Sequence, residues 1–337
     1  MSGFRWLVPL LLPVIVLSLL LAVAAWPAVH LAPRDVRIGL LAPEPLAADI
    51  SARLDSAGFE VQPYADASLA ITAIEDRDIY GAIILSGDEP QVLIASAASP
   101  VVAEILRSVA GQIAGTTSPI APSPVDVVPL PSSDPRGAGF TASLFPLFIT
   151  AILTAVATVF TVRAPARRLL VLTMSSLLSA VVAAVLMREW LAVLGDADWL
   201  SIVAVIGLAM LTLATLTAGL YMALGFAGIG LGAVLIIMIG NPLSGATSSP
   251  DLLPGWASLT GSLLPPGAFA TLLRSAAFFG GSGGSGPLLI LLVWLALGVV
   301  LLGRPLIQER RRRSRHQTDA DPVSPASPAA QGSTPAS

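Results

Sequence analysis

The feature that most constrains this chain is the separation of its charged residues from five long apolar runs. No Asp, Glu, Arg or His occurs within Leu7–Val29, Phe140–Val162, Leu169–Met187, Trp199–Gly240 or Pro287–Gly303. A helix needs roughly 20 such residues to cross a bilayer. Only 12% of all residues are charged and the mean hydropathy is +0.82, whereas about a quarter of the residues of a soluble protein are charged. The chain is therefore expected to be a polytopic α-helical membrane protein.

The longest run predicts a sixth crossing. Trp199–Gly240 is about twice as long as one span, which predicts a hairpin of two helices that turns near Thr217–Tyr221. With six spans and a cytoplasmic N-terminus, the positive-inside rule places both arginine clusters in the cytoplasm. These clusters comprise Arg163, Arg167, Arg168, Arg304, Arg310–Arg313 and Arg315. If the longest run crossed the membrane only once, the total number of crossings would be odd and the second arginine cluster would lie outside the cell. An even number of crossings therefore also favours the hairpin, with both termini in the cytoplasm.

The first run is expected to remain in the protein as a membrane anchor, within residues 1–29. A secretory signal peptide has a shorter apolar core of about 7–15 residues and a small-residue cleavage site. Ala22-Val23-Ala24 offers such a site. The uninterrupted length of the run favours the anchor, and cleavage stays open as the alternative.

Residues 30–139 have an ordinary polar composition and lie between the first span and the others. Asp66 and Ser99 are expected to be helix N-caps, and Gly58 is expected to end a helix. Strands are expected at Val36–Leu41, Phe59–Tyr64, Tyr80–Leu85, Gln91–Ala95 and Val125–Leu130, and helices at Pro45–Ala57, Ala67–Ile79 and from Pro100 through Val109. This order predicts an inserted extracytoplasmic α/β domain with one main sheet, followed by a Pro-rich linker.

No catalytic, cofactor or metal constellation is evident, so the chain is not expected to be an enzyme. It has no cysteine, which excludes disulfides and thiolate metal sites. It also has no lysine, so the ATP-binding pattern G-x-x-x-x-G-K-[ST] cannot occur. Spans without ionisable residues argue against a carrier that is coupled through an intramembrane carboxylate. Arg188 and Glu189 are expected to be a surface pair rather than a gate.

Small residues are frequent in the predicted spans of residues 140–240. Gly228 and Gly232 have GxxxG spacing, which lets helices approach closely. The pattern fits helix packing within one subunit and a homodimer seam equally well, and both alternatives stay open.

Residues 241–286 are predicted to form a second extracytoplasmic loop. The apolar segment Phe269–Phe279 carries one charge, Arg274. It is too short to span a membrane and suits a re-entrant or interfacial helix. The segment GGSGGSG at 280–286 predicts a flexible hinge before the last span, residues 287–303.

The tail, residues 304–337, is predicted to be cytoplasmic. Its arginine run is expected to fix topology, with binding of anionic lipids as the alternative. The Pro-, Ser- and Ala-rich segment that follows predicts disorder, and no other feature suggests nucleic-acid binding. All 18 basic residues are arginine and 28 residues are proline, a bias typical of high-GC bacteria such as actinobacteria.

One helix, an inserted α/β domain and five further helices resemble the ABC-2 type transporter permeases of the phage-infection-protein (YhgE/Pip-like) group. The pattern Ala73–Arg77 followed by Tyr80–Leu85 is similar to a recurrent segment of that group. NPLSG (241–245) and LPPGAFATLLRSAAFFGG (264–281) resemble the loop before its last helix. The motif positions to which the likeness gives a structural or transport role are Asn241, Pro242, Gly245, Pro265, Pro266, Gly267 and Arg274.

The resemblance covers most of residues 1–303 and implies a permease subunit of an export system in the bacterial plasma membrane. Its expected cargo is an apolar or amphipathic envelope compound, and a separate ATPase would supply the energy. Membrane lipids and a second copy of the chain are the other expected partners, and no cofactor is expected. The alternative is a membrane scaffold or receptor whose α/β domain binds an envelope partner, because no charged coupling helix is evident in the short cytoplasmic segments. An intramembrane enzyme is disfavoured, since the spans lack His, Asp and Glu, while an apolar lipid-flipping path stays open.

Overall fold

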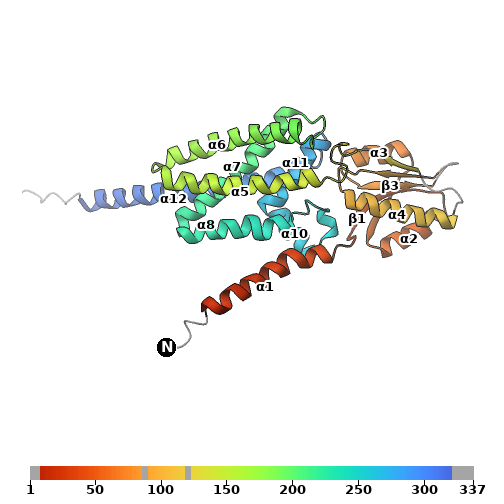
Figure 1. The fold of residues 1–337 in the computed structure, drawn as a ribbon, viewed down its shortest axis with the longest axis horizontal. Helices are drawn as coiled ribbons and strands as arrows, with labels where there is room; N and C mark the ends of the chain where they lie inside the picture. The colour runs from red at the N-terminus through yellow and green to blue at the C-terminus, as the bar shows by residue number, and fades with distance from the viewer. Residues whose placement is uncertain (1–7, 86–89, 118–122, 321–337) are drawn as a thin grey trace, which may run out of the picture.

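The computed structural model describes residues 8–85, 90–117 and 123–320. A bundle of long helices and an α/β domain lie end to end along the long axis of the molecule (Figure 1). The α/β domain occupies the segment between α1 (Val8–Val29) and α5 (Ala138–Thr161). A helical protein with an inserted α/β domain, as the sequence predicted, is therefore confirmed.

The α/β domain is built on one five-stranded sheet with the strand order β2-β1-β3-β4-β5. Strands β3 and β4 are antiparallel, and the other neighbours are parallel. Its elements are β1 (Val36–Leu41), α2 (Leu46–Ser56), β2 (Phe59–Pro63), α3 (Ala67–Glu75), β3 (Gly81–Ile84), β4 (Gln91–Ile94), α4 (Pro100–Thr117) and β5 (Ser123–Asp126). Each expected strand and helix is present, within a few residues of its predicted bounds. The segment Gly87-Asp88-Glu89-Pro90 predicts a turn between β3 and β4, and its residues 87–89 lie outside the described residues.

Local side-chain contacts fix the helix starts as predicted. The carboxylate of Asp66 accepts a hydrogen bond from the backbone N–H of Ser68 at 2.9 Å, and Ser99 Oγ accepts one from the N–H of Val102 at 3.2 Å. Gly58 ends α2 with a φ of +89°, in the left-handed region that favours glycine. Apolar residues of α2 and α4 pack on one face of the sheet and those of α3 on the other.

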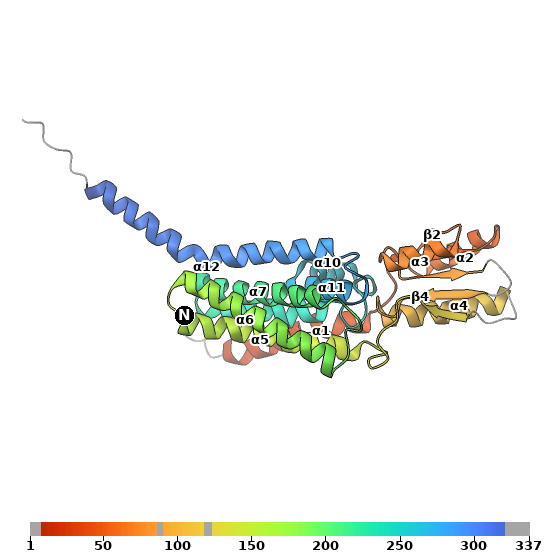
Figure 2. The same cartoon turned by 90° about the horizontal axis from the view of Figure 1, so that it is seen from above.

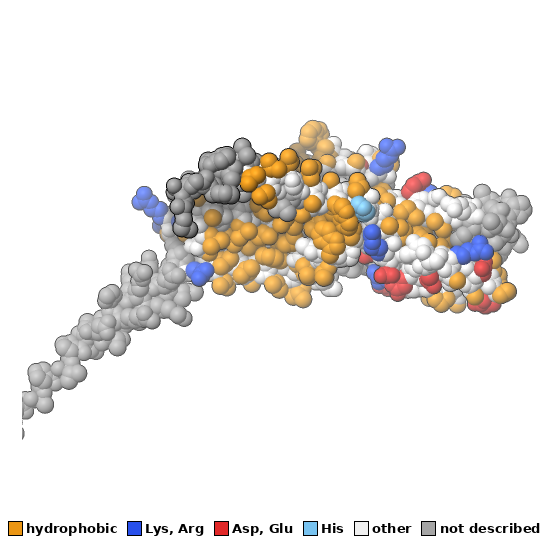
Figure 3. Space-filling view, turned by 90° about the horizontal axis from the view of Figure 1, so that it is seen from below, with side chains coloured by type: hydrophobic (Ala, Val, Ile, Leu, Met, Phe, Trp, Pro, Cys, Tyr) orange, Lys and Arg blue, Asp and Glu red, His pale blue; other side chains and the backbone are white. Residues whose placement is uncertain are grey.

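Among the described residues, five helices are long and apolar enough to cross a membrane. They are α5, α6 (Pro165–Val185) with its π-helical end η1 (Leu186–Trp190), α7 (Trp199–Leu224), α8 (Phe226–Ala233) with its continuation η2 (Val234–Gly240), and α12 (Ser285–Ala320). Helix α7 is central, because it contacts α5, α6, α8 and α12. Apolar side chains cover the bundle surface, while charged side chains gather on the α/β domain and at the opposite end (Figure 3). The chain is a multi-pass membrane protein by this pattern.

The predicted position of the α7–α8 hairpin turn is wrong. The turn falls at Gly225, with φ +64° and ψ −143°, rather than near Thr217–Tyr221. Thr217 and Gly219 lie inside α7, and a methyl group on Gly219 would come within 2.7 Å of the Gly298 carbonyl oxygen of α12. The segment is helical because it packs against α12.

The small residues of α8 serve packing within the subunit. Gly228 and Gly232 are both buried. A methyl group on Gly228 would overlap the carbonyl of Leu220 in α7, and one on Gly232 would lie 3.2 Å from Thr217 Oγ1. Of the two alternatives that the sequence left open, the GxxxG pattern therefore serves the α7–α8 contact.

The loop between η2 and α12 is mostly helical. It contains α9 (Asn241–Leu243), the 3-10 turn η3 (Pro250–Leu252), α10 (Gly255–Leu263) and α11 (Pro265–Phe278). Helix α11 lies where the bundle meets the α/β domain (Figure 1) and is largely buried in protein. The segment expected to be a flexible hinge is an ordered turn, in which the N–H of Gly281 bonds to the carbonyl of Ser275 and that of Gly284 to the carbonyl of Gly281, both at 3.0 Å.

Helix α12 continues to Ala320, past the predicted end of the span at Gly303. In Figure 2 it leaves the bundle at the end opposite the α/β domain. The first part of the tail predicted to be disordered is therefore helical, and residues 321–337 lie outside the described residues.

Candidate functional site at the domain junction

Two of the predicted motif segments meet where the α/β domain joins the bundle. Residues of 240–245 pack against residues of 261–267 through backbone contacts that leave no room for side chains. A methyl group on Gly267 would overlap the carbonyl of Gly261, and one on Gly240 would lie 2.6 Å from Pro266 Cγ. Gly245 adopts a φ of +66° beside Pro250. Gly245, Pro266 and Gly267 are therefore packing residues.

Asn241 and Pro242 belong to α9, which contacts α10 and α11, and Pro265 is the first residue of α11. Asn241 and Pro242 are the first two residues of the short helix α9. The carbonyl of Asn241 accepts a hydrogen bond from the hydroxyl of Ser244 at 2.7 Å. Pro265 begins α11 and is buried. A proline at the first position of a helix has no N–H to leave unpaired. These residues shape the backbone that carries the next predicted site residue, Arg274.

Arg274 is the one charged residue of α11, and its side chain is only 6% exposed. Its Nη2 donates to the carbonyl of Ala246 at 2.9 Å, and its guanidinium lies 5.4 Å from the centre of the Phe140 ring. Burial, together with the nearby charge of Arg77, lowers the pKa of Arg274 to about 10. The structure thus places Arg274 inside the junction rather than at a lipid interface.

Arg77 reaches the same place from the α/β domain. It follows α3 with a φ of +64°, and its Nη1 donates to the carbonyl of Thr271 in α11 at 3.3 Å. Its guanidinium lies 5.0 Å from the centre of the Phe279 ring. With Arg37 of β1, the two arginines line a cavity of about 200 Å³. Sequence patterns do not predict that these three arginines meet, because they are far apart along the chain.

Hydroxyl groups connect the α/β domain to the loop after η2. Tyr80 donates to Asp251 Oδ2 at 2.9 Å and lies 2.6 Å from Ser249 Oγ. Ser99 Oγ donates to the carbonyl of Ser248 at 2.5 Å. Burial raises the pKa of Tyr80, and the charge of Asp251 raises it further. The only sequence signal for Tyr80 was its place at the head of the recurrent strand pattern.

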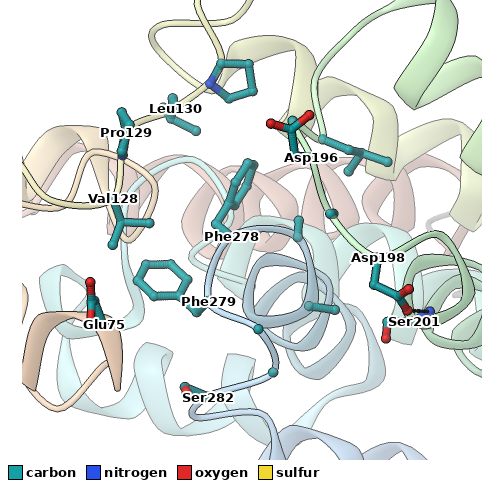
Figure 4. A pocket seen from close by; sticks show the side chains of 18 of the residues that line it. Glu75, Val128, Pro129, Leu130, Asp196, Asp198, Ser201, Phe278, Phe279 and Ser282 are labelled. Carbon is teal, nitrogen blue, oxygen red and sulfur yellow. Dashed lines mark hydrogen bonds between the residues drawn. The ribbon is translucent and has the colours of Figure 1, made fainter. Parts of the chain in front are cut away.

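A larger and more open hollow of about 800 Å³ lies beside this junction (Figure 4). Phe278 and Phe279 project into it from the end of α11, and Val128–Leu130 form the opposite wall. Its acidic side chains are Glu75, Asp76, Asp196 and Asp198. The hollow therefore combines an aromatic surface with a negatively charged rim and opens between the α/β domain, the α6–α7 loop and α11.

The comparison with protein families decides what kind of chain carries this junction. A model of the ABC-2 family transporter proteins matches residues 4–304. The chain belongs to the ABC-2 transporter family. Searches of curated proteins and of solved structures returned no match. Membership makes the chain a membrane component of a transporter rather than a catalytic subunit, and ABC-2 permeases normally work with a partner ATPase.

Among the described residues of this ABC-2 chain, the buried polar side chains of the spans carry hydroxyl groups. Thr212, Thr215 and Thr217 of α7 are buried, and each donates to a backbone carbonyl four residues earlier. Ser176 Oγ is the one buried side-chain polar atom without a partner among the described residues. The three threonine hydroxyls of α7 are thus satisfied by the backbone of their own helix.

Arg188 and Glu189 of this ABC-2 chain form a pair 3.6 Å apart at η1. Arg188 also donates to the carbonyl of Ala197 at 2.8 Å. The exposed fractions of the two side chains are 33% and 70%. They are a surface pair, as predicted. In the described part of the chain, no cluster of three His, Cys, Asp or Glu residues is arranged for a metal ion.

Proposed function

We propose that this chain is the permease subunit of an ABC-2 export system and moves an apolar or amphipathic envelope compound. The observation that carries the proposal is the family match across residues 4–304 together with a bundle in which the described residues of the spans include no buried ionisable side chain. A charged cargo would need compensating charges along its path, because an unpaired charge inside a bilayer is costly. The aromatic surface of the hollow at Phe278 and Phe279 suits the apolar part of such a compound.

The proposed topology has six spans, which are α1 and the five long helices described above, and it places the α/β domain outside the cytoplasm. Arg163 lies in the α5–α6 connection and Arg167 in the first turn of α6, and both are exposed, as is Arg304 on α12. The α5–α6 connection and the outgoing part of α12 lie at the end of the bundle away from the α/β domain (Figure 1). The positive-inside rule puts that end in the cytoplasm. Retention of α1 is supported by its packing, since Pro27 is buried and the Trp26 ring lies 5.9 Å from that of Trp256 in α10.

The proposal includes the phage-infection-protein-like subgroup, an actinobacterial origin and a homodimer. A second copy would pack along an apolar face, for which α12 offers the exposed residues Leu289, Val293 and Val300. Lipid acyl chains would cover the same residues in a monomer. The energy would come from a separate ATPase, since the chain lacks the lysine that an ATP-binding loop requires.

Copurification tests the proposal. The full chain is extracted from its native host in a mild detergent, and the proteins that accompany it are identified. We expect an ATPase subunit whose ATP hydrolysis falls when this chain is deleted. Repeated extraction without any ATPase would refute the export function.

The alternative is a membrane scaffold or receptor, and one observation favours it. The connections at the proposed cytoplasmic end are too short for a coupling helix, because α5 and α6 are joined by residues 162–164 and α7 and α8 by Gly225 alone. Under this alternative, removal of residues 36–130 abolishes function while membrane insertion and abundance persist. A deletion variant that keeps its function would exclude the scaffold.

A further inference from the structure

The cavity at the junction brings together positive charge without negative charge. Arg274 contributes from α11, Arg77 from the loop after α3 and Arg37 from β1, and no carboxylate of the described residues lines the cavity. The ion pairs of the described residues lie on α2, on α4 and at η1, and none of them includes an arginine of this cavity. A buried guanidinium without a counter-ion is unfavourable unless other groups compensate it.

The protein compensates these charges only in part. Each guanidinium has five N–H donors. Arg274 gives one hydrogen bond to the Ala246 carbonyl, and Arg77 gives one to the Thr271 carbonyl. Among the described residues, the side chain of Arg37 makes no hydrogen bond within the protein. The faces of two phenylalanine rings add weak stabilisation. Most donors of the three groups remain available to a ligand in the cavity.

The nearest acidic group does not fill this role. Asp251 lies beside Arg77, but its Oδ2 accepts the hydroxyl of Tyr80, and the residue does not line the cavity. Asp78 and Arg37 both lie near Tyr64, and Asp78 does not line the cavity either. The charge of the cavity is therefore left for an anion from outside the chain.

We propose that this cavity binds a phosphate group through Arg274, Arg77 and Arg37. A cavity of about 200 Å³ that is lined by three arginines suits a compact anion with several oxygens, because the planar fork of arginine matches pairs of phosphate oxygens. The phosphate group belongs either to free inorganic phosphate or to a phospholipid head group, since the cavity is lined by residues of both the α/β domain and the bundle, and these two parts meet end to end (Figure 1).

Binding would join the two parts of the molecule. Arg37 and Arg77 belong to the α/β domain, and Arg274 belongs to the bundle. A phosphate group between them would stabilise the docked arrangement of the two parts. The site is independent of the proposed export function and would exist equally in a scaffold.

Thermal unfolding of the full chain in detergent tests the site. Tryptophan fluorescence is followed with inorganic phosphate, and separately with chloride at equal ionic strength. A second series adds phosphatidylglycerol, with the uncharged lipid diacylglycerol as its control. We expect a saturable rise in the unfolding temperature with one of the two phosphate sources.

Substitutions then locate the effect. Arg37→Gln removes a donor that has no described bond within the protein, so this variant should fold, and we expect it to weaken phosphate binding at least tenfold. Arg77→Gln and Arg274→Gln should weaken it as strongly, while Arg53→Gln, which removes an exposed arginine of α2, should leave it unchanged. A response to inorganic phosphate identifies the free anion, and a response only to phosphatidylglycerol identifies the head group. No response to either, or a response that Arg37→Gln and Arg77→Gln leave unchanged, overturns the proposal.

Discussion

At the residue scale, the contact between the two motif segments depends on the absence of a side chain at Gly261. A methyl group there would overlap the carbonyl of Leu243, whereas one on Gly255, in the same helix α10, would meet no atom within 4 Å. We expect Gly261→Ala to lower the free energy of unfolding by about 1–3 kcal/mol, because an overfilled contact forces the backbone apart. Gly255→Ala is the matched control and should have little effect. Thermal unfolding followed by tryptophan fluorescence measures both, and equal stability of the two variants would contradict the contact.

Tyr80 gives a second prediction at this scale, in the dependence of stability on pH. Burial raises the pKa of Tyr80 above its ordinary value of 10.0, so the folded protein keeps the phenol proton at a pH where the unfolded chain loses it. The contribution of Tyr80 to the free energy of unfolding is fully present below pH 10.0. Above pH 10.0 it is lost with rising pH, by up to about 1.4 kcal/mol per pH unit. Tyr80→Phe should show a shallower decline between about pH 9 and about pH 11 in denaturant unfolding. Parallel declines in the two proteins would show that Tyr80 is not buried as described.

At the scale of elements, the α7–α8 contact depends on one face of α8. Gly228 faces the carbonyl of Leu220, while Gly230 is exposed and has no atom near its position. We expect Gly228→Ala to destabilise the bundle by about 1–3 kcal/mol and Gly230→Ala to leave it unchanged. Both variants should keep the oligomeric state of the parent in light scattering. A Gly228→Ala variant that is fully stable but changes its oligomeric state would instead assign this face to a dimer seam.

At the scale of the whole molecule, the α/β domain and the α5–α6 connection should lie on opposite sides of the membrane. The chain has no cysteine, so each introduced cysteine is the single thiol. We expect a membrane-impermeant maleimide to label Asp55→Cys of α2 in intact spheroplasts, and to label Ala166→Cys only after permeabilisation, because both positions are exposed. The parent chain should remain unlabelled. Labelling of Ala166→Cys in intact spheroplasts would reverse the proposed orientation.

Much of the fold follows from patterns that are local in the sequence. Strand β1 has the predicted bounds Val36–Leu41, and Asp66 caps α3 as predicted. Such features depend on residues a few positions apart. The α7–α8 turn could not be placed in this way, because a uniformly apolar run carries no periodic signal. Its position at Gly225 depends on the contact of Gly219 with α12, which is distant in the sequence.

The candidate site could likewise be predicted only in part from the sequence. Arg274 was recognisable as the lone charge of an apolar segment, but its partners were not. Arg77 and Tyr80 come from the α/β domain, and Asp251 comes from the loop that follows η2. No pattern in one segment indicates which residue of another will contact it.

The sequence alone determined that this protein crosses the membrane several times and carries an α/β domain between its first two long apolar helices. Both properties can be recognised from residues that are close together in the sequence, because charge is excluded from a membrane span and because strands and helices have different local patterns. Only the tertiary structure decided that α11 is buried, that the motif segments serve the packing of backbone on backbone, and that arginines from both parts of the molecule face one cavity. The physical reason is that these properties depend on which surfaces dock together. That choice is made by shape and burial across the whole molecule.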